Sequence, residues 1–134
     1  MIDKLVLSLG LHQEMISHIQ NCLPEEACGL LVGRGDEVVK VFPITNILHS
    51  PVSFLMDPLE QFNAMVWQEE HEMNLLAIYH SHPNGPSYPS EKDMMEFAYP
   101  GSPYIVWSLQ GGQWHIFGFM ISSADFTEIE LIWR

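Results

Sequence analysis

The sequence predicts an α/β fold in which a mixed β-sheet is covered by helices on both faces. Apolar runs of strand length recur along the chain, segments with helical periodicity lie between some of them, and turn-forming residues separate the elements. Strands that alternate with helices favour the packing of helices in layers on a sheet. The 134 residues are enough to bury about two thirds of the chain's surface, so we expect residues 1–134 to form a single domain.

The first half of the chain is predicted to contain a short strand, a helix and a β-hairpin. The helix is indicated by an apolar stripe at helical spacing, which consists of Leu11, Met15, Ile19 and Cys22. Two apolar runs that flank a turn with glycines at 33 and 35 indicate the hairpin. The expected elements are a strand at 5–9, a helix at 11–22, and strands at 27–32 and 38–42.

The middle of the chain is predicted to contain a loop, a short strand and a second helix. We expect the loop at residues 44–51 and the strand at 53–56. A helix at 58–72 is indicated by its start, because Asp57 is a favourable N-cap and Pro58 suits the first helical turn.

The last part of the chain is predicted to add a buried strand, a short helix, a second hairpin and a final strand. A helix beginning at Ser90 is expected to end at Tyr99-Pro100-Gly101, and Gly111-Gly112 is expected to form the hairpin turn. The expected elements are strands at 75–79, 104–109, 114–120 and 127–133, and a helix at 90–98.

Composition excludes several classes of protein. The formal charge of −12, with only five scattered lysines and arginines, argues against a nucleic-acid-binding surface. No apolar run approaches the roughly 18 residues of a membrane span. The first residues lack the basic stretch and apolar core of an export signal, so we expect a cytoplasmic protein. Cys22 and Cys28 are too few for a disulfide framework.

Two histidines and a carboxylate form the most informative pattern in the chain. His80 and His82 alternate along an extended backbone directly after an apolar run, so their side chains lie on one face. The turn-rich loop at 83–89 can fold back and return Asp93 to that face. Such a set binds zinc and leaves a fourth position open, as catalytic sites do. Surface histidines beside a helix that Ser90 caps fit the same spacing, which leaves both interpretations open.

Hydrolysis at such a zinc requires a base that takes a proton from a bound water. Glu25 and Glu26 lie at the entrance of the strand predicted at 27–32. A carboxylate at a strand entrance is usually only solvated, and spacing alone does not bring either glutamate to the histidines.

Taken together, Glu26, His80, His82, Ser90 and Asp93 resemble the motif of the JAMM (MPN-plus) metalloprotease family. That motif is a glutamate, then far downstream His-x-His, seven residues, a serine, two residues and an aspartate, and every position is filled here. The segment at 50–58 also looks like the family's middle segment. The resemblance covers most of the chain and implies a three-layer α-β-α sandwich around a mixed sheet, related to the cytidine deaminases, in one JAMM domain of the minimal prokaryotic JAB-domain type.

The resemblance also implies a role for each motif residue. His80, His82 and Asp93 would bind one zinc ion per chain. Glu26 would act as the general base that accepts a proton from the zinc-activated water and passes it to the leaving amine. Ser90 would donate a hydrogen bond to the oxyanion of the intermediate.

The implied function is that of a zinc-dependent isopeptidase or peptidase. Family members cut amide bonds at the C-terminal tail of ubiquitin or of ubiquitin-like sulfur-carrier proteins. This short chain lacks room for long insertions, so a ubiquitin-like or sulfur-carrier substrate is expected in place of polyubiquitin. A Gly-Gly tail passes through a narrow groove because it has no side chains, and it is expected to add a strand to an exposed sheet edge.

Two other functions stay open on the sequence alone. A non-catalytic MPN scaffold module usually loses motif residues, and none is lost here. A protein similar to the RadC family, which is linked to DNA repair, shares the motif spacing; the acidic charge argues against it, and a basic groove would favour it. The sequence names neither the exact substrate nor the oligomeric state nor an activating partner, and it assigns no role to Asn46 or Cys28.

Overall fold

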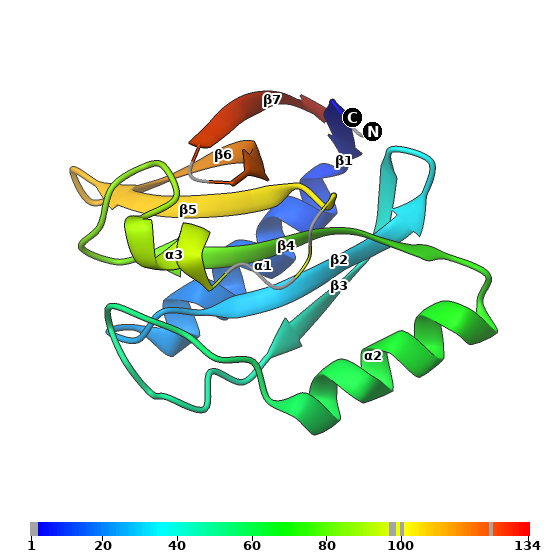
Figure 1. Ribbon diagram of the computed structural model, residues 1–134, viewed down its shortest axis with the longest axis horizontal. Coiled ribbons are helices and arrows are strands. Elements are labelled where there is room, and N and C mark those ends of the chain that lie inside the picture. Colours follow the sequence, from blue (N-terminus) through cyan, green and yellow to red (C-terminus); the bar gives the residue numbers. More distant parts are fainter. Residues whose placement is uncertain (1–2, 97–98, 100, 124) are drawn as a thin grey trace.

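The computed structural model describes residues 3–96, 99, 101–123 and 125–134. Seven strands and three helices follow one another in these residues (Figure 1). In chain order they are β1 (Lys4–Leu7), α1 (Leu9–Cys22), β2 (Cys28–Arg34), β3 (Glu37–Ile44), α2 (Pro58–Glu70), β4 (Asn74–His82), α3 (Glu91–Met95), β5 (Tyr104–Gln110), β6 (Gln113–Ser122) and β7 (Asp125–Trp133).

The strands form one mixed sheet in the order β1-β3-β2-β4-β5-β6-β7. The pairs β4–β5 and β1–β7 are parallel, and both predicted hairpins, β2–β3 and β5–β6, are antiparallel. The sheet closes on itself through β1, which was not predicted from the sequence. The strand β1 pairs with β7 over four residue pairs and with β3 at one, Val6 with Glu37. Pairing between the first and last strands leaves no trace in local periodicity, which explains why the sequence did not indicate it.

Helices lie on opposite faces of the central strands (Figure 1). On one face, Leu11, Met15 and Ile19 of α1 pack in a core cluster with Leu31 and Tyr79. On the other, a second cluster gathers around α2 and consists of Cys28, Leu30, Ile44, Met56, Ala64, Ile78 and Tyr104. Successive side chains of a strand point to opposite faces, so β2 and β4 contribute alternately to the two clusters. Helices therefore pack on both faces of β2 and β4, and the mixed sheet is confirmed. The described strands form a closed seven-stranded sheet, where the resemblance implied a three-layer sandwich.

Several predicted boundaries changed. The structure extends β4 through His82, so both histidines belong to the strand and do not follow it. The strand predicted at 53–56 is reduced to one bridge between Asn46 and Met56. The helix predicted at 90–98 ends at Met95, while positions 97–98 of that prediction and Pro100 of its stop signal lie outside the described residues.

The predicted N-cap of α2 and the predicted hairpin turn between β5 and β6 are confirmed. Asp57 caps α2 by accepting hydrogen bonds from the backbone N–H groups of Leu59 and Glu60 at 2.9 and 3.2 Å. Gly111 and Gly112 both have positive φ, at 59° and 78°, as a tight turn between antiparallel strands requires. Across the described parts of the chain, no helix is long and apolar enough to span a membrane.

Candidate metal centre

The centre is built on the end of β4. His80 and His82 lie on the strand face that carries the α2 cluster, and both are buried. Their Nε2 atoms are 2.7 Å apart. The side chain of Ser81 points to the opposite face, where its hydroxyl accepts a hydrogen bond from the backbone N–H of Ala27 at 2.8 Å. Strand geometry therefore brings the two imidazoles together and also ties β4 to the start of β2.

Asp93 reaches the histidines from the first turn of α3. Its Oδ2 lies 3.1 Å from His80 Nε2 and 3.0 Å from His82 Nε2, and it accepts a hydrogen bond from the backbone N–H of Ser90 at 2.8 Å. The Ser90 hydroxyl accepts in turn from the backbone N–H of Asp93 at 3.0 Å, which completes a capping box. The helix start thereby fixes the Asp93 carboxylate against the histidines.

Each imidazole is held in place by its surroundings. His82 Nδ1 donates to the carbonyl of Pro86 at 2.7 Å, so in the neutral imidazole the lone pair of Nε2 faces the cluster. Gly85 allows this contact, because a Cβ there would lie 2.9 Å from His82 Cβ. His80 is stacked between the rings of Phe54 and Tyr104, at centroid distances of 4.9 and 4.7 Å.

Glu26 completes the cluster from the segment before β2. A carboxylate oxygen of Glu26 and a nitrogen of each histidine all lie within 4.8 Å of one another. The residue is 4% exposed and its Oε1 has no hydrogen-bond partner among the described residues. Burial raises the pKa of Glu26 to about 8, an effect that nearby Asp93 reinforces and His82 opposes. The neighbouring Glu25 is more exposed and accepts a contact from His49 Nδ1 at 3.1 Å, so only Glu26 faces the histidines.

The charges of the cluster depend on one another. Burial alone would raise the pKa of Asp93, but hydrogen bonds from His80 and His82 hold it far below its usual range. Burial lowers the pKa of His80, although Asp93 acts to raise it. Burial would also lower the pKa of His82, but its hydrogen bonds to Asp93 and Pro86 outweigh this and raise it. An ionised carboxylate therefore faces two imidazoles of unequal basicity.

The donor set fits a zinc ion. His80 Nε2, His82 Nε2 and Asp93 Oδ2 converge with separations of 2.7 to 3.1 Å. Tetrahedral zinc with bonds of about 2.0–2.2 Å requires donors roughly 3.3 Å apart, so a small outward shift accommodates the ion. The buried Glu26 carboxylate without a partner is also what a cation at this place would stabilise.

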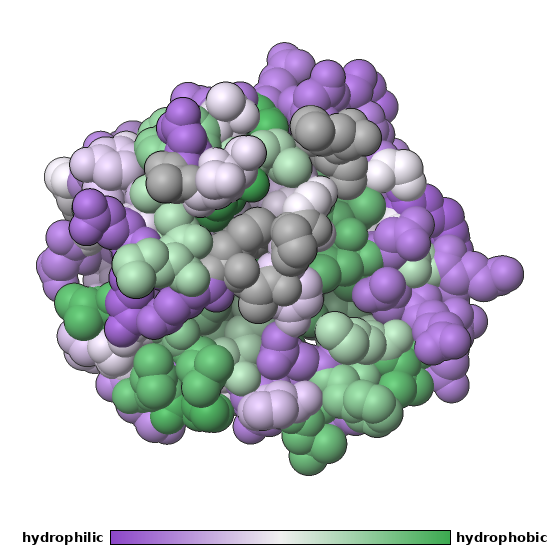
Figure 2. Space-filling model, in the orientation of Figure 1, coloured by the Kyte–Doolittle hydropathy of each residue, from purple (hydrophilic) through white to green (hydrophobic). Residues whose placement is uncertain are grey.

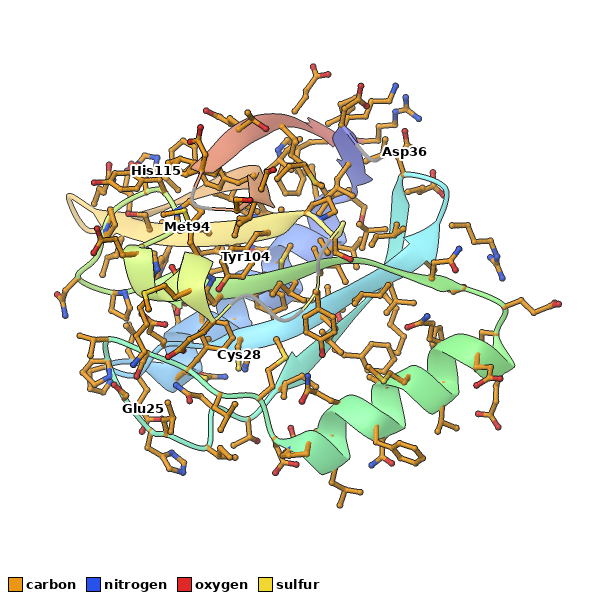
Figure 3. All side chains as sticks on the ribbon, viewed as in Figure 1. Glu25, Cys28, Asp36, Met94, Tyr104 and His115 are labelled. Carbon is orange, nitrogen blue, oxygen red and sulfur yellow. The ribbon has the colours of Figure 1, made fainter. Side chains whose placement is uncertain are left out.

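The structure brings together four of the five residues of the predicted motif, with Ser90 directly beside Asp93. Cys28 lies in the core cluster beneath the centre, where its thiol donates to the carbonyl of Ile44 at 3.5 Å and burial raises its pKa to about 12. Figure 3 places Cys28 and Tyr104 inside the molecule and Glu25 towards its edge.

Sequence reasoning missed the residues that support the centre, namely Asn46, Phe54, Ser81 and Tyr104. Ser81 is the residue between the two histidines of the motif, and this position on a strand was a signal that its side chain faces the other way. Tyr104 hydrogen-bonds Asp93, and burial followed by nearby acidic groups raises its pKa far above the usual value. Phe54 and Asn46 carry no comparable signal, because their contacts depend on the path of the loop.

A groove of about 410 Å³ opens beside Asp93. It is lined mainly by apolar side chains from the 46–57 segment, β4 and β5, together with Lys92 of α3 and Glu96, which follows that helix. Near it, exposed apolar side chains gather on the outer face of α2 and in the 46–57 segment, visible as the hydrophobic areas along the lower part of Figure 2. These residues are Ile47, Leu48, Val52, Leu55, Leu59, Phe62, Met65 and Val66.

Known proteins resemble this chain in both sequence and fold. Residues 8–125 match the family described as prokaryotic homologs of the JAB domain. The chain is 40% identical over 103 residues to a Thermus thermophilus protease named for cleaving TtuB-protein conjugates, an alignment that covers 76% of this chain and 68% of the relative. It is 31% identical over 113 residues to a CysO-cysteine peptidase of Mycobacterium tuberculosis, covering 83% and 77% of the two chains. A desampylase of Pyrococcus furiosus is 44% identical over 69 residues, which cover 52% of this chain and 49% of the relative.

Solved structures agree with this assignment. A Desulfitobacterium hafniense protein of known solution structure superposes with a TM-score of 0.88 at 35% identity, covering 97% of this chain and 92% of that chain. A JAB1/MPN domain protein from Archaeoglobus fulgidus superposes with a TM-score of 0.58 at 19% identity over 98% of this chain and 100% of that chain, which supports the fold alone. The resemblance inferred from the motif is confirmed, and the chain belongs to the family of prokaryotic JAB-domain proteins.

Proposed function

We propose that this protein is a zinc-dependent isopeptidase or peptidase that hydrolyses amide bonds at the C-terminal tail of a ubiquitin-like or sulfur-carrier protein. The observation that carries the proposal is the convergence of His80, His82 and Asp93 within 3.1 Å, next to the buried carboxylate of Glu26. Relatives named as a desampylase, a CysO-cysteine peptidase and a protease of TtuB-protein conjugates support this choice of reaction and substrate class.

In this proposal His80, His82 and Asp93 hold one zinc ion per chain. Bound there, zinc would polarise the scissile carbonyl and acidify a water. In the neutral imidazole, donation from His82 Nδ1 to the Pro86 carbonyl leaves Nε2 as the ligand atom that faces the cluster. The backbone N–H of Ser90 keeps the Asp93 carboxylate pointed at the same place.

Glu26 is proposed as the general base and Ser90 as an oxyanion donor. The Glu26 carboxylate accepts a proton from the attacking water and returns it to the leaving amine, a transfer that its unpartnered Oε1 is free to make. The Ser90 hydroxyl uses its lone pair to cap α3, which leaves its hydrogen available to an oxygen that gains negative charge.

The groove beside Asp93 is proposed to receive the tail of the substrate. A tail ending in Gly-Gly would approach the centre with little steric hindrance, because glycine has no side chain. The apolar side chains exposed on α2 and in the 46–57 segment support a protein as the substrate, since large exposed apolar patches mark interaction sites. The sequence-based expectation that the tail adds a strand to a sheet edge stays a prediction.

The decisive experiment is an intact-mass assay on zinc-loaded protein. Ubiquitin-like sulfur carriers extended beyond Gly-Gly are incubated with the wild type, with Glu26→Gln and with Glu25→Gln, each with and without a chelator. We expect cleavage after the second glycine by the wild type and Glu25→Gln, and none by Glu26→Gln or with chelator present. Equal cleavage by Glu26→Gln would overturn the proposed base, and cleavage that resists chelation would overturn the zinc site.

Both alternative functions lose support. A scaffold module has no need for a buried and unpartnered Glu26 carboxylate, which costs free energy to bury. A DNA-repair function similar to that of RadC would require a basic groove, whereas Lys92 is accompanied by Asp93 and Glu96 among the described residues that line the groove here.

A further inference from the structure

Asn46 is buried at the start of the segment that links β3 to α2. It is 6% exposed, and its side chain makes four hydrogen bonds. Its Oδ1 accepts from the backbone N–H groups of Leu48 and Leu55, both at 3.1 Å. Its Nδ2 donates to the backbone carbonyls of Glu26 and Ser53, both at 3.0 Å. One side chain thus connects Glu26 with both ends of a loop.

These bonds use the full capacity of a carboxamide, which offers two donor hydrogens and an oxygen with two lone pairs. Other side chains of similar size do not provide this set. An aspartate at position 46 would keep both acceptors but would place an oxygen against the carbonyls of Glu26 and Ser53. Position 46 therefore requires a side chain that both donates two hydrogen bonds and accepts two, and not only one of the right volume.

Glu26 lies two residues before β2 begins at Cys28, so it is outside the strand. Its backbone therefore depends on this loop for its position. Its backbone N–H donates to the carbonyl of Ser50 at 2.8 Å, and its carbonyl accepts from Asn46. Both polar groups of its backbone are therefore held by the 46–57 segment. The backbone in turn sets the direction in which the carboxylate leaves the chain.

The same loop contacts the metal centre from another side. Phe54 lies next to Ser53 and stacks on the ring of His80 at 4.9 Å. Asn46 binds the carbonyl of Ser53 and the N–H of Leu55, so its bonds flank Phe54 on both sides. The buried amide of Asn46 therefore positions both Glu26 and Phe54, the ring that stacks on His80.

We propose that Asn46 is a positioning residue, which sets the Glu26 carboxylate relative to His80 and His82 by tying the backbone of Glu26 to the 46–57 segment. The inference deepens the proposed function and rests on it for the role of Glu26. Because Asn46 contributes no ligand atom to the cluster, its loss would impair proton transfer while zinc stays bound.

The test compares Asn46→Asp with Asn21→Asp in zinc-loaded protein. Asn21 is exposed on α1, so the control adds the same charge away from the centre. For Asn46→Asp we expect one zinc per chain, a KM within about threefold of the wild type and a kcat lower by about 10- to 100-fold, as for the loss of a group that orients the reaction. The control should change neither constant. The substrate is the extended carrier that the wild type cleaves.

Hydrogen exchange supplies a readout that does not need turnover. In Asn46→Asp, exchange should accelerate in peptides that contain the amides of Glu26, Leu48 and Leu55, while β5 and β6 keep their protection. If the wild type cleaves no carrier, the proposed function fails and this arm alone decides whether Asn46 holds Glu26. Unchanged exchange at Glu26 would overturn the positioning role in either case.

Three further outcomes would overturn the proposal. These are a kcat within twofold of the wild type in folded Asn46→Asp, a loss of zinc in parallel with kcat, and a rise in KM alone. Asn46→Ser serves as a second variant in case the aspartate does not fold. If neither variant folds, the amide is needed for the fold as a whole and the specific link to Glu26 is rejected.

Discussion

Glu25 and Glu26 are neighbours in the chain, yet their carboxylates lie in different environments. Glu25 contacts His49 at the surface, whereas Glu26 is 4% exposed and faces the histidine pair. The sequence placed both at a strand entrance, and only the family motif favoured the second. The buried position raises the pKa of Glu26, which suits its proposed role as a base that takes up and releases a proton.

The first prediction concerns this carboxylate. Glu26→Gln keeps the shape of the side chain and removes its basicity, so kcat should fall by about 10²–10⁴-fold while zinc stays bound. Zinc per chain is measured by elemental analysis beside the rate. Glu25→Gln is the matched control and should retain its rate; a comparable loss in that variant would indicate a general charge effect.

The second prediction concerns the ligands. His80→Ala removes one of three donors and should abolish zinc binding at micromolar concentrations. In the wild type, zinc at 100 times its Kd should add about 2.7 kcal/mol to the free energy of unfolding, and this gain should vanish in the variant. Thermal unfolding with and without zinc measures it. His49→Ala, at an exposed histidine, should behave as the wild type, and full zinc occupancy in His80→Ala would refute the assignment.

The third prediction concerns Ser81. Its hydroxyl is buried and accepts from the N–H of Ala27, which would lose its partner in Ser81→Ala. A buried donor without an acceptor costs about 1–3 kcal/mol. The free energy of unfolding, measured by chemical denaturation, should therefore fall by that amount. Ser17→Ala, at a helix position on α1, gives the baseline for removing a hydroxyl. An unchanged free energy of unfolding in Ser81→Ala would show that Ala27 finds another acceptor.

At the scale of elements, α3 spans five residues and still fixes one of the three proposed ligands. So short a helix has little stability of its own, since forming the first turn is costly. The capping box between Ser90 and Asp93 therefore determines both where the helix begins and where the carboxylate points. Ser90 was predicted as an N-cap and as an oxyanion donor; the cap is confirmed, and the catalytic role stays a prediction.

The fourth prediction separates the two effects of this cap. Ser90→Ala should cost about 0.5–2 kcal/mol of stability as a lost N-cap. It should also weaken zinc binding by about 10–100-fold, because the carboxylate loses the turn that orients it. Ser8→Ala removes the cap of α1, where the hydroxyl accepts from Leu11, and should lower stability alone. Equal zinc affinity in the two variants would contradict the link between cap and ligand.

The parts of the site that were predictable are those that a motif or a local rule encodes. His80 and His82 follow from strand alternation, and Ser90 follows from capping rules. Asn46 and Phe54 were not predictable, since their contacts with Glu26 and His80 arise when the loop closes over the sheet. The predicted strand at 53–56 failed for the same reason: side-chain bonds to Asn46 replace most of the backbone ladder.

For the whole molecule, the sequence predicted the mixed sheet and its helices but not its closure. The short β1 joins β7 and touches β3, and its Leu5 is fully buried in the α1 core cluster. That cluster lies on the face of the sheet opposite the histidines. The residues that close the sheet and those that surround the histidines therefore belong to different core clusters. That residues 1–134 form a single domain stays a prediction.

The fifth prediction tests this separation. Leu5→Ala should lower the free energy of unfolding by about 2–5 kcal/mol, as expected for a large-to-small change in a core. The folded variant should bind one zinc with unchanged affinity, because Leu5 lies away from the ligands. Val39→Ala, at an exposed position on β3, is the control and should change neither quantity. Weaker zinc binding in Leu5→Ala would show that closure of the sheet reaches the centre.

The single bridge between β1 and β3 has a consequence for the behaviour of the protein at high concentration. Beyond Glu37, the described part of β3 pairs with β2 alone, so its other edge forms no ladder with a further strand among the described residues. Two residues of β3 disfavour pairing with a strand of another molecule. Pro43 has no N–H to donate, and Lys40, whose ammonium group lies over the rings of Phe42 and Trp67, carries a charge. Replacing both by threonine and valine would offer neighbouring molecules a row of free amides, and light scattering should then reveal sheet-to-sheet polymers in concentrated samples.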